Sequence, residues 1–147
     1  MHVEESGVVN QPVKLVFDYV ADPVNLPEWS GAAVEVRDLE QTTPGEPGKG
    51  DKFTPVHKFL GQRIEEHFEV TAYESNRRIT HWSTGGPMPL EINHIFEEVP
   101  EGTRLTVSMD ARSAGFLRLI APVFKAAVKR QIRNDLGTLK SLLELRG

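Results

Sequence analysis

The C-terminal stretch from Ser113 to Gly147 constrains the fold more than any other part of the sequence. Apolar residues recur there three or four positions apart, which is the spacing of one helical face. The stretch therefore predicts a long amphipathic helix. Because such a helix is marginal in water on propensity alone, a large apolar surface elsewhere in the chain must cover this face. The residues of the predicted face are Leu117, Ile120, Ala121, Phe124, Val128, Ile132, Leu136, Leu139 and Leu143.

The first part of the chain predicts one strand, two short helices and a second strand. Val3 to Val9 has the pattern of a strand, and Pro12 is well placed in the first turn of a following helix. A second short helix extends from Pro23 toward Trp29, because proline, asparagine and serine punctuate this segment too densely for a longer one. From Ala32 to Thr42, valines alternate with charged residues, which predicts a strand with one solvent face. These valines are Val34 and Val36.

A meander of strands is predicted from Asp51 onward. Four or five strands follow one another with only short turns between them, so no crossover helix fits and the strands must be antiparallel. The segment from Thr43 to Gly50, rich in proline and glycine, is a loop before them. Alternation assigns one face of each strand to the interior. In the strand around residue 80, the inward position of His81 rather than Trp82 is left open. The predicted inward residues are Phe53, Pro55, His57, Phe59, Ile64, Glu66, Phe68, Val70, Ala72, Ile79, His81, Ser83, Leu90, Ile92, His94, Phe96, Leu105, Val107, Met109 and Ala111.

The composition excludes several classes of protein. The length of 147 residues predicts a single domain over 1–147. The absence of cysteine excludes a disulfide framework, a thiolate metal site and a cysteine nucleophile.

The N-terminus lacks the apolar region of a secretion signal, and no segment approaches about 18 uninterrupted apolar residues. We therefore expect a soluble cytoplasmic protein. The net charge of −4 argues against nucleic acid as a partner. A basic run predicts a solvated helix face; it consists of Lys125, Lys129, Arg130 and Arg133.

Three segments carry a resemblance to a known family. They are VFDYVADPVNLPEWS (Val16 to Ser30), Phe96 to Glu98 together with Gly102 to Arg104, and the leucine-rich ending from Asp135 to Glu144. In this order they resemble the START-like superfamily, also called SRPBCC, and more narrowly its polyketide cyclase/dehydrase branch. The resemblance implies an α+β helix-grip fold, in which a curved antiparallel sheet of six to seven strands wraps around the long C-terminal helix and leaves a hydrophobic cavity. Members bind lipids, sterols, polyketides or plant hormones, and some are cyclases or dehydratases. The family has no universal catalytic residue, so the resemblance transfers none.

Four polar residues stand out on the predicted inward face: His57, Glu66, His81 and His94. In an apolar cavity a few such groups fix the orientation of a ligand. Burial would raise the pKa of a glutamate and prepare it for acid/base chemistry, and a histidine beside it can share that task. Glu66 and His94 are therefore the candidate catalytic residues. The alternative for each single residue is a structural or solvated position.

We expect a small hydrophobic molecule to be held between the sheet and the helix. Binding of such a ligand, for transport or sequestration, is the first hypothesis. The second is a cofactor-independent cyclase or dehydratase that uses a histidine and a glutamate of the cavity. The third is a partner-binding module whose own side chains fill the cavity, and the chain is expected to be a monomer or homodimer. The predicted ligand contacts are His57, Phe59, Glu66, Phe68, His81, Ile92, His94, Phe96, Met109 and Phe124.

No metal or organic cofactor is expected. Histidine and carboxylate are ordinary ligands of zinc and iron, but the sequence has no pair of histidines at helical i, i+4 spacing and no H-x-H on one strand. Gly45, Gly48 and Gly50 lie in a proline-broken loop that lacks the strand-then-helix context of a phosphate-binding motif. The sequence also lacks a G-x-S-x-G elbow, so covalent hydrolase chemistry is unsupported.

Two segments are candidates for the access route to the cavity. Gly85 to Pro89 is a stiff loop of glycine and proline. Gly115 to Phe124 is apolar nearly all round, which most simply predicts a buried segment. The alternative for it is a lid or a transient membrane-docking element, supported by the basic residues that follow. Pro122 predicts a kink or a delayed helix start in this segment.

Overall fold

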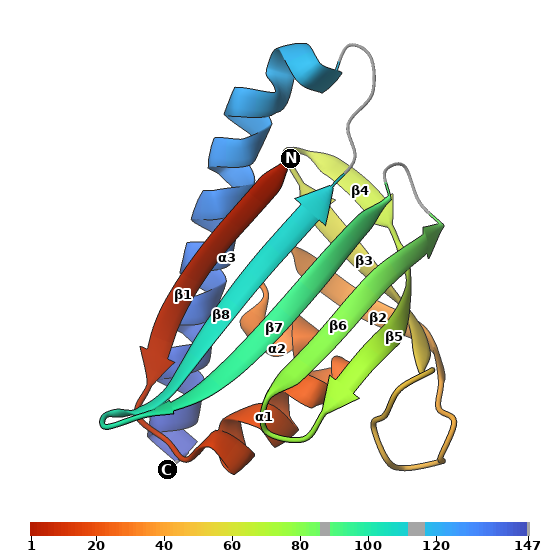
Figure 1. Ribbon diagram of the computed structural model, residues 1–147. Coiled ribbons are helices and arrows are strands. Elements are labelled where there is room, and N and C mark those ends of the chain that lie inside the picture. The colour runs from red at the N-terminus through yellow and green to blue at the C-terminus, as the bar shows by residue number, and fades with distance from the viewer. Residues whose placement is uncertain (86–88, 112–116, 147) are drawn as a thin grey trace.

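The computed structural model describes residues 1–85, 89–111 and 117–146. Within them the elements follow the predicted order of strand, short helices, strands and long helix (Figure 1). The elements are β1 (His2–Val9), α1 (Val13–Ala21), the 3-10 helix η1 (Pro23–Asn25), α2 (Leu26–Trp29), β2 (Ala33–Glu40), β3 (Lys52–Phe59), β4 (Gln62–Glu65), β5 (His67–Glu74), β6 (Arg78–Gly85), β7 (Leu90–Val99), β8 (Gly102–Ala111) and α3 (Leu117–Arg146).

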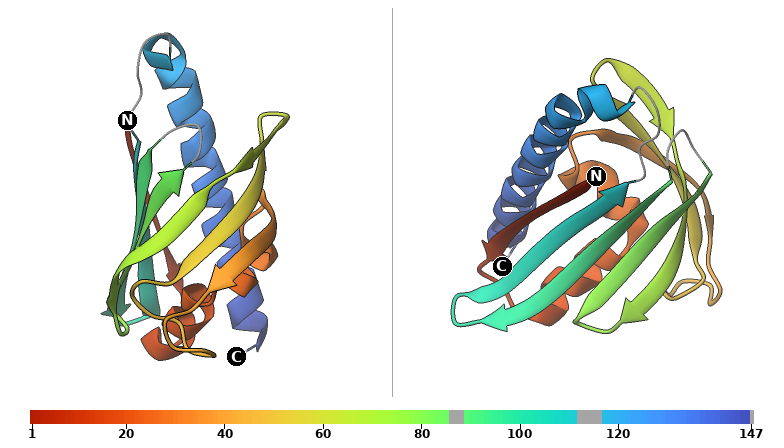
Figure 2. Two further views of the ribbon diagram at one scale, coloured as in Figure 1. Left: turned by 90° about the vertical axis from the view of Figure 1, so that its right-hand side faces the viewer. Right: turned by 45° about the horizontal axis from the view of Figure 1, so that its top comes forward.

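The described strands form one antiparallel sheet in the order β1-β8-β7-β6-β5-β3-β2, with β4 paired to β3 outside this path. From β5 to β8 each strand pairs with the next one along the chain, which confirms the predicted meander. The sheet curls around α3, and the short helices lie at one end of the space between them (Figures 1 and 2). This arrangement is the predicted α+β helix-grip fold.

From β3 to β8, the inward faces of the strands agree with the predicted alternation, with one exception. At β6 the open choice falls to His81, which lines the interior cavity, whereas Trp82 does not. The exception is Ala72. The register shifts between Val70 and Ala72, so that Ala72 pairs with Thr80 and Tyr73 pairs with the buried Ile79. Because opposed residues share a face, Tyr73 takes the inward position that was predicted for Ala72.

Two further irregularities separate the observed strands from the predicted ones. The strand predicted from Ile64 to Ala72 is divided into β4 and β5 at Glu66, whose N–H donates to the Pro55 carbonyl at 3.2 Å. β2 has a register shift between Ala33 and Glu35, and Val34 is 44% exposed. A bulge inserts one residue and thereby reverses the alternation of faces. Val34 and Val36 therefore do not share one buried face as predicted.

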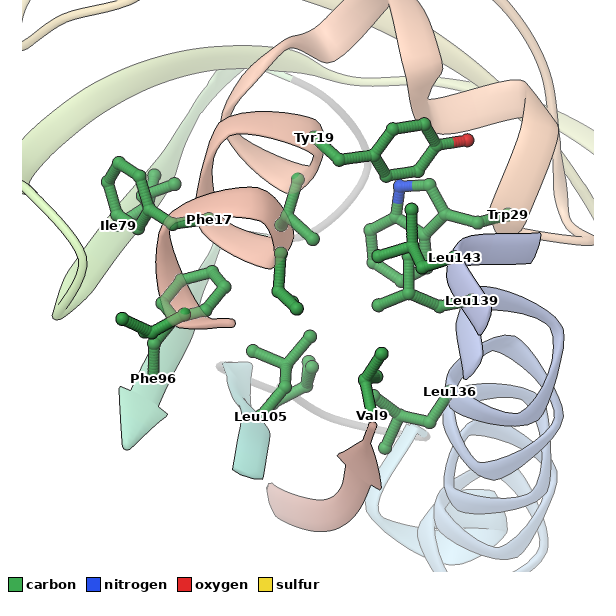
Figure 3. Packing of buried hydrophobic residues seen from close by; sticks show 14 of the residues in the cluster. Val9, Phe17, Tyr19, Trp29, Ile79, Phe96, Leu105, Leu136, Leu139 and Leu143 are labelled. Atoms are coloured by element: carbon green, nitrogen blue, oxygen red, sulfur yellow. The ribbon is translucent and has the colours of Figure 1, made fainter. Parts of the chain in front are cut away.

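The solid core lies at one end of the fold, between α1, the C-terminal half of α3 and the sheet (Figure 3). Phe17 of α1 is fully buried. Its ring lies edge-on to Tyr73 and Phe96, with ring centroids 5.3 and 5.0 Å away. Leu139 and Leu143 of α3 are at most 1% exposed and project toward the α1 side of this core (Figure 3). The second half of α3 therefore buries its apolar face as the sequence predicts.

The turn between β7 and β8 requires Gly102, whose φ is +142°. A Cβ at this position would lie 2.3 Å from the carbonyl oxygen of Val9 and 2.8 Å from the backbone nitrogen of Gln11, so only glycine fits. The next residue, Thr103, is fully buried and donates from Oγ1 to the Gln11 carbonyl at 2.8 Å. This turn therefore fixes the chain where it passes from β1 to α1.

α3 spans 30 residues, and its part from Phe124 to Asp135 lines the cavity. Pro122 lies inside the helix, so it does not delay the helix start, and the first turn of α3 is set at an angle to the rest (Figure 1). Two predicted access segments fall largely outside the described residues. These are 86–88 in the loop from Gly85 to Pro89, and 112–116 together with the side chains from Leu117 to Ala121.

Candidate functional site

A cavity of about 230 Å³ lies between the inner face of the sheet and the part of α3 from Phe124 to Asp135. Strands β3 to β8 supply one wall, α3 supplies the opposite wall, and the segment from Val20 to Ala32 closes the end next to the core. Most of the lining side chains are aliphatic or aromatic. The fold therefore contains an apolar chamber with a small number of polar groups on its walls.

The residues predicted to contact a ligand line this cavity, with the exception of Phe96. Phe96 lies deeper, in the core, where its ring packs against Phe17. Alternation identifies the inward face of a strand, but it does not show how far along the strand a cavity extends. Ligand contact by the lining residues stays a prediction. The predicted residues that line the cavity are His57, Phe59, Glu66, Phe68, His81, Ile92, His94, Met109 and Phe124.

His81 on β6 and His94 on β7 lie side by side on the cavity wall. The register pairs His81 with Ile92 and Ile79 with His94, so the two histidines are diagonal neighbours on one face of the sheet. Their ring centroids are 5.2 Å apart. The ring of Phe53 lies edge-on to His81 at 5.1 Å. The two imidazoles are therefore set among apolar rings rather than among charged groups.

Burial keeps both imidazoles neutral at pH 7. It lowers the pKa of His94 to about 4, while a hydrogen bond with the Ile79 backbone acts to raise it. Burial, and after it the neighbouring His94, lowers the pKa of His81 well below its ordinary value. A neutral imidazole has one N–H donor and one nitrogen acceptor. The pair can therefore form hydrogen bonds with an uncharged ligand.

The Nδ1 atom of His94 is buried and has no hydrogen-bond partner in the described part of the chain. Nearly all buried polar atoms in proteins have a partner, because an unpaired one costs about 1–3 kcal/mol. The ring of Trp29, 6.4 Å away between centroids, packs edge-on against His94. Since His94 lines the cavity, a molecule in the cavity can supply the missing hydrogen bond.

Glu66 lies at the junction of β4 and β5, and its side chain lines the cavity, as do those of Ile64 and Phe68. It is 6% exposed and accepts a hydrogen bond from Ser83 Oγ at 3.0 Å. Burial raises the pKa of the Glu66 carboxyl group, while the Ser83 hydrogen bond and the nearby His67 lower it. At neutral pH this group therefore holds a proton more readily than an exposed glutamate does.

Asp135 is a polar lining residue that the sequence analysis did not select. It lies on α3 and accepts hydrogen bonds from Ser30 Oγ (3.1 Å), the Gly31 N–H (2.9 Å) and Gln131 Nε2 (2.8 Å). Burial raises its pKa, and these three hydrogen bonds lower it. Asp135 thus ties α3 to the connection between α2 and β2. Its signal in the sequence is its place on the apolar face of the helix, three residues after Ile132.

The short helices also contribute more to the cavity than the sequence analysis predicted. Val20, Pro23, Leu26 and Trp29 line the end of the cavity next to the core. Alternation of faces, which located the other lining residues, applies to strands and carries no information about this segment. The resemblance of the segment from Val16 to Ser30 to the START-like proteins is a sequence signal for its role.

Two aromatic rings close the rim of the cavity on the side away from the core. Phe59 at the end of β3 and Phe124 on α3 meet edge to face, with centroids 5.6 Å apart. His57 lies on the same face of β3 as Phe59, and burial lowers its pKa. This aromatic contact bridges the gap between the edge of the sheet and the helix.

Within residues 1–85, 89–111 and 117–146, no group of three or more histidine and carboxylate side chains is placed to hold a metal ion. In the same ranges, no helix combines the length and apolar character needed to cross a bilayer.

Sequence comparison decides the family. The family described as "Polyketide cyclase / dehydrase and lipid transport" matches residues 1–144. The chain belongs to this family. The match confirms the resemblance to the polyketide cyclase/dehydrase branch of the START-like proteins. No curated protein matches the sequence significantly.

Several solved structures share this fold. A START superfamily protein from Mycobacterium smegmatis has a TM-score of 0.80 and 17% identity over 99% of both chains. The Zhui aromatase/cyclase from Streptomyces sp. R1128 has a TM-score of 0.78 and 18% identity over 99% of this chain and 94% of that chain. TTHA0849 from Thermus thermophilus has a TM-score of 0.78 and 18% identity over 96% of this chain and 95% of that chain. At these identities the likeness shows a shared fold and no shared ligand.

Proposed function

We propose that this polyketide cyclase/dehydrase family member binds a small, largely apolar molecule with a hydroxyl group in the cavity between the sheet and α3. The observation that carries the proposal is the unpaired Nδ1 of His94 on a mostly apolar wall. Ligand pockets typically combine an apolar lining with a few polar groups that fix the orientation of the ligand. The cavity has this composition.

The volume of the cavity limits the size of the ligand. At about 230 Å³ it is larger than a cavity of about 150 Å³ that takes up benzene. It is smaller than typical drug-sized sites, which begin at about 300 Å³. A ligand of one or two fused rings, or a short aliphatic chain, suits this volume better than a sterol or a long-chain lipid.

A hydroxyl group suits the polar wall because it can both donate and accept a hydrogen bond. It can therefore pair with His94 Nδ1 in either tautomer of the neutral ring. An ionised ligand is less suitable, since both imidazoles are neutral at pH 7 and burial of an unpaired charge is costly.

Binding can be tested by isothermal titration calorimetry with 2-naphthol as the probe. We expect one molecule to bind per chain. Ile92→Trp places an indole in the cavity and should lower the affinity at least tenfold. Its matched control is Glu91→Trp, at the neighbouring residue of β7 that pairs with Trp82 outside the cavity, and this variant should stay within twofold. Native mass spectrometry of freshly purified protein tests for a co-purified ligand. The proposal fails if 2-naphthol does not bind and no molecule co-purifies.

A cyclase or dehydratase activity is a second candidate, favoured by the raised pKa of the buried Glu66 carboxyl group. Proton transfer is most efficient when the pKa of the acid or base lies near the working pH. Burial moves Glu66 toward that value, whereas it moves His94 away from it, to about 4. Glu66 is therefore the better candidate for proton transfer, and His94 the better candidate for orienting the ligand.

This second function predicts dehydration of a β-hydroxy ketone probe, with release of water. Glu66→Gln should abolish turnover while the affinity for 2-naphthol stays within a few-fold, because the glutamine amide keeps the size of the side chain but cannot transfer a proton. Turnover that survives in Glu66→Gln would refute the role of Glu66. Absence of turnover in the unaltered protein would refute the activity and leave the binding proposal standing.

A further inference from the structure

The turn between β3 and β4 contains an exposed leucine in a backbone conformation that leucine rarely adopts. Leu60 has a φ of +50° and Gly61 a φ of +78°, and the pair Phe59 and Gln62 closes a two-residue hairpin around them. Positive φ at both central positions is typical of type I′ turns, which favour asparagine, aspartate or glycine at the first position. The Leu60 side chain is also 64% exposed. Neither packing nor backbone preference explains a leucine there.

Leu60 adjoins the rim of the cavity. The preceding residue, Phe59, makes the aromatic contact with Phe124 across the rim. Val123, next to Phe124 on α3, is 74% exposed. The β3–β4 turn and the first half of α3 lie at the same end of the molecule in both views of Figure 2. Two exposed apolar side chains thus flank the aromatic contact that closes the rim.

The two segments that border the rim carry only positive charges, although the chain as a whole carries −4. The segment 57–64 contains Lys58 and Arg63 and no acid, and 122–134 contains four cations and no acid. Some of these cations pair with acids of other segments, as Arg63 does with Glu35 at 2.8 Å. Lys58 and Lys125 form no ion pair with any described residue. Their charges are therefore available to an external anionic surface.

We propose that this rim surface, formed by Leu60, Val123, Lys58 and Lys125, docks on an anionic lipid bilayer. Exposed apolar side chains enter the boundary between headgroups and acyl chains, and cations beside them are attracted to anionic lipids. The proposal builds on the proposed ligand binding: a docked rim lets an apolar ligand pass between the bilayer and the cavity without crossing water. The unfavourable φ of Leu60 persists because leucine serves docking rather than folding.

A second copy of the chain is a less suitable occupant of the rim surface. A symmetric dimer buries the same patch of both subunits against itself. Such a contact would bring Lys58 and Lys125 of one subunit close to the same residues of the other, and like charges repel. An anionic bilayer has the complementary charge.

Flotation with vesicles tests the proposal on the full chain. We expect vesicles of phosphatidylcholine and phosphatidylglycerol in a 7:3 ratio to bind the protein at least tenfold more strongly than pure phosphatidylcholine. Salt at 1 M should remove this difference, because it shortens the Debye length to about 3 Å. Leu60→Asn should lower binding at least fivefold and raise Tm by about 2–5 °C, since asparagine tolerates the left-handed conformation. If Leu60 were needed only for folding, Leu60→Asn would instead lower Tm.

Matched controls separate the rim from general effects of hydrophobicity and charge. Val24→Asn removes a side chain that is 61% exposed on η1, at the core end of the molecule, and should change binding less than twofold. Lys125→Glu should lower binding at least fivefold. Lys49→Glu makes the same change in net charge in the loop before β3 and should stay within twofold.

Several outcomes would overturn the proposal: absence of binding to the anionic vesicles, unchanged binding by Leu60→Asn, or a lower Tm of that variant. A chain that is dimeric in solution and becomes monomeric in Leu60→Asn, without binding vesicles, would assign the rim to a second copy instead. Titration with 2-naphthol without vesicles should be unaffected by Leu60→Asn. Loss of docking is therefore distinguishable from loss of ligand binding.

Discussion

The imidazole rings of His81 and His94 lie 5.2 Å apart on neighbouring strands, in a cavity where burial lowers the pKa of both. Folding therefore holds two bases uncharged that would bind protons in the unfolded chain below about pH 6.5. This relationship links the cavity to the stability of the whole fold.

The pH dependence of unfolding should show this link. With a pKa of about 4 for His94 in the folded state, the unfolded chain binds more protons between about pH 6.5 and 4. The free energy of unfolding therefore falls as the pH falls through this window. Between about pH 7 and 4.5 the contribution of His94 is about 2 kcal/mol. Urea denaturation of the parent protein and His94→Phe at both pH values measures it. Between pH 7 and 4.5, the free energy of unfolding should fall by about 2 kcal/mol less in His94→Phe than in the parent protein. An equal fall in both proteins would contradict the lowered pKa of His94.

The hydrogen bond proposed between His94 and a ligand hydroxyl predicts a selectivity. The ratio of the affinities for 2-naphthol and naphthalene should fall about fivefold in His94→Phe, because one hydrogen bond to a buried group contributes about 1 kcal/mol. The ratio cancels changes in cavity shape that affect both probes equally. Phe68→Leu is a suitable control, since it alters the apolar wall and leaves His94 in place. A ratio that His94→Phe does not change would exclude this hydrogen bond.

Glu66 should affect stability with the opposite sign to His94. Its pKa is raised in the folded state, so the stabilisation from the protonated form is present below its unfolded pKa and is lost as the pH rises through the folded value. Glu66→Gln removes this titration. We expect the stability of the variant relative to the parent to increase with pH above about 4.5 in urea denaturation. A relative stability that does not change with pH would contradict the raised pKa of Glu66.

Asp135 should stabilise the contact between α3 and the connection from α2 to β2. Asp135→Ala removes the acceptor of three hydrogen bonds and leaves the Ser30 hydroxyl group in a buried site. We expect the free energy of unfolding to fall by about 2–3 kcal/mol. Asn134→Ala, at the exposed neighbour on the same helix, should change it by less than about 0.5 kcal/mol. Equal effects of the two substitutions would show that Asp135 is not a structural link.

The turn at Gly102 should tolerate no side chain. Gly102→Ala brings a Cβ within 2.3 Å of the Val9 carbonyl oxygen and should lower the free energy of unfolding by about 3 kcal/mol. Gly48→Ala is the matched control, because a Cβ at Gly48 meets no atom within 4 Å. Thermal denaturation of both variants checks the expectation. A stable Gly102→Ala variant would mean that the β7–β8 turn can move away from Val9.

Periodicity predicts most of this fold because its elements bury one face each. The helical spacing from Val128 to Leu143 and the alternation from Phe53 to Ala111 correspond to surfaces that the structure buries. The failures occur where the backbone departs from regular geometry. Bulges at β2 and β5 reverse the faces at Val34 and Ala72, and a bulge depends on pairing between strands that a single sequence does not reveal.

The candidate site was predictable to the extent that it lies on strands. His57, Glu66, His81 and His94 were selected as polar residues on inward faces, and all four line the cavity. Asp135 and Trp29 were not selected, because their place in the cavity depends on how helices lie against the sheet. Leu60 was not noticed, because the sign of its φ becomes visible only in the folded hairpin. Packing between elements, rather than local pattern, determines these positions.

The division of α3 into a half that borders the cavity and a half that completes the core has a consequence for evolution. Leu136, Leu139 and Leu143 cannot change without loss of stability, since they fill closely packed space. Phe124, Val128 and Ile132 border empty volume, so exchanges among apolar residues there alter the shape of the chamber at little cost to folding. One helix thus allows the shape of the cavity to diverge while the scaffold is retained, and structures only 17–18% identical still share this fold.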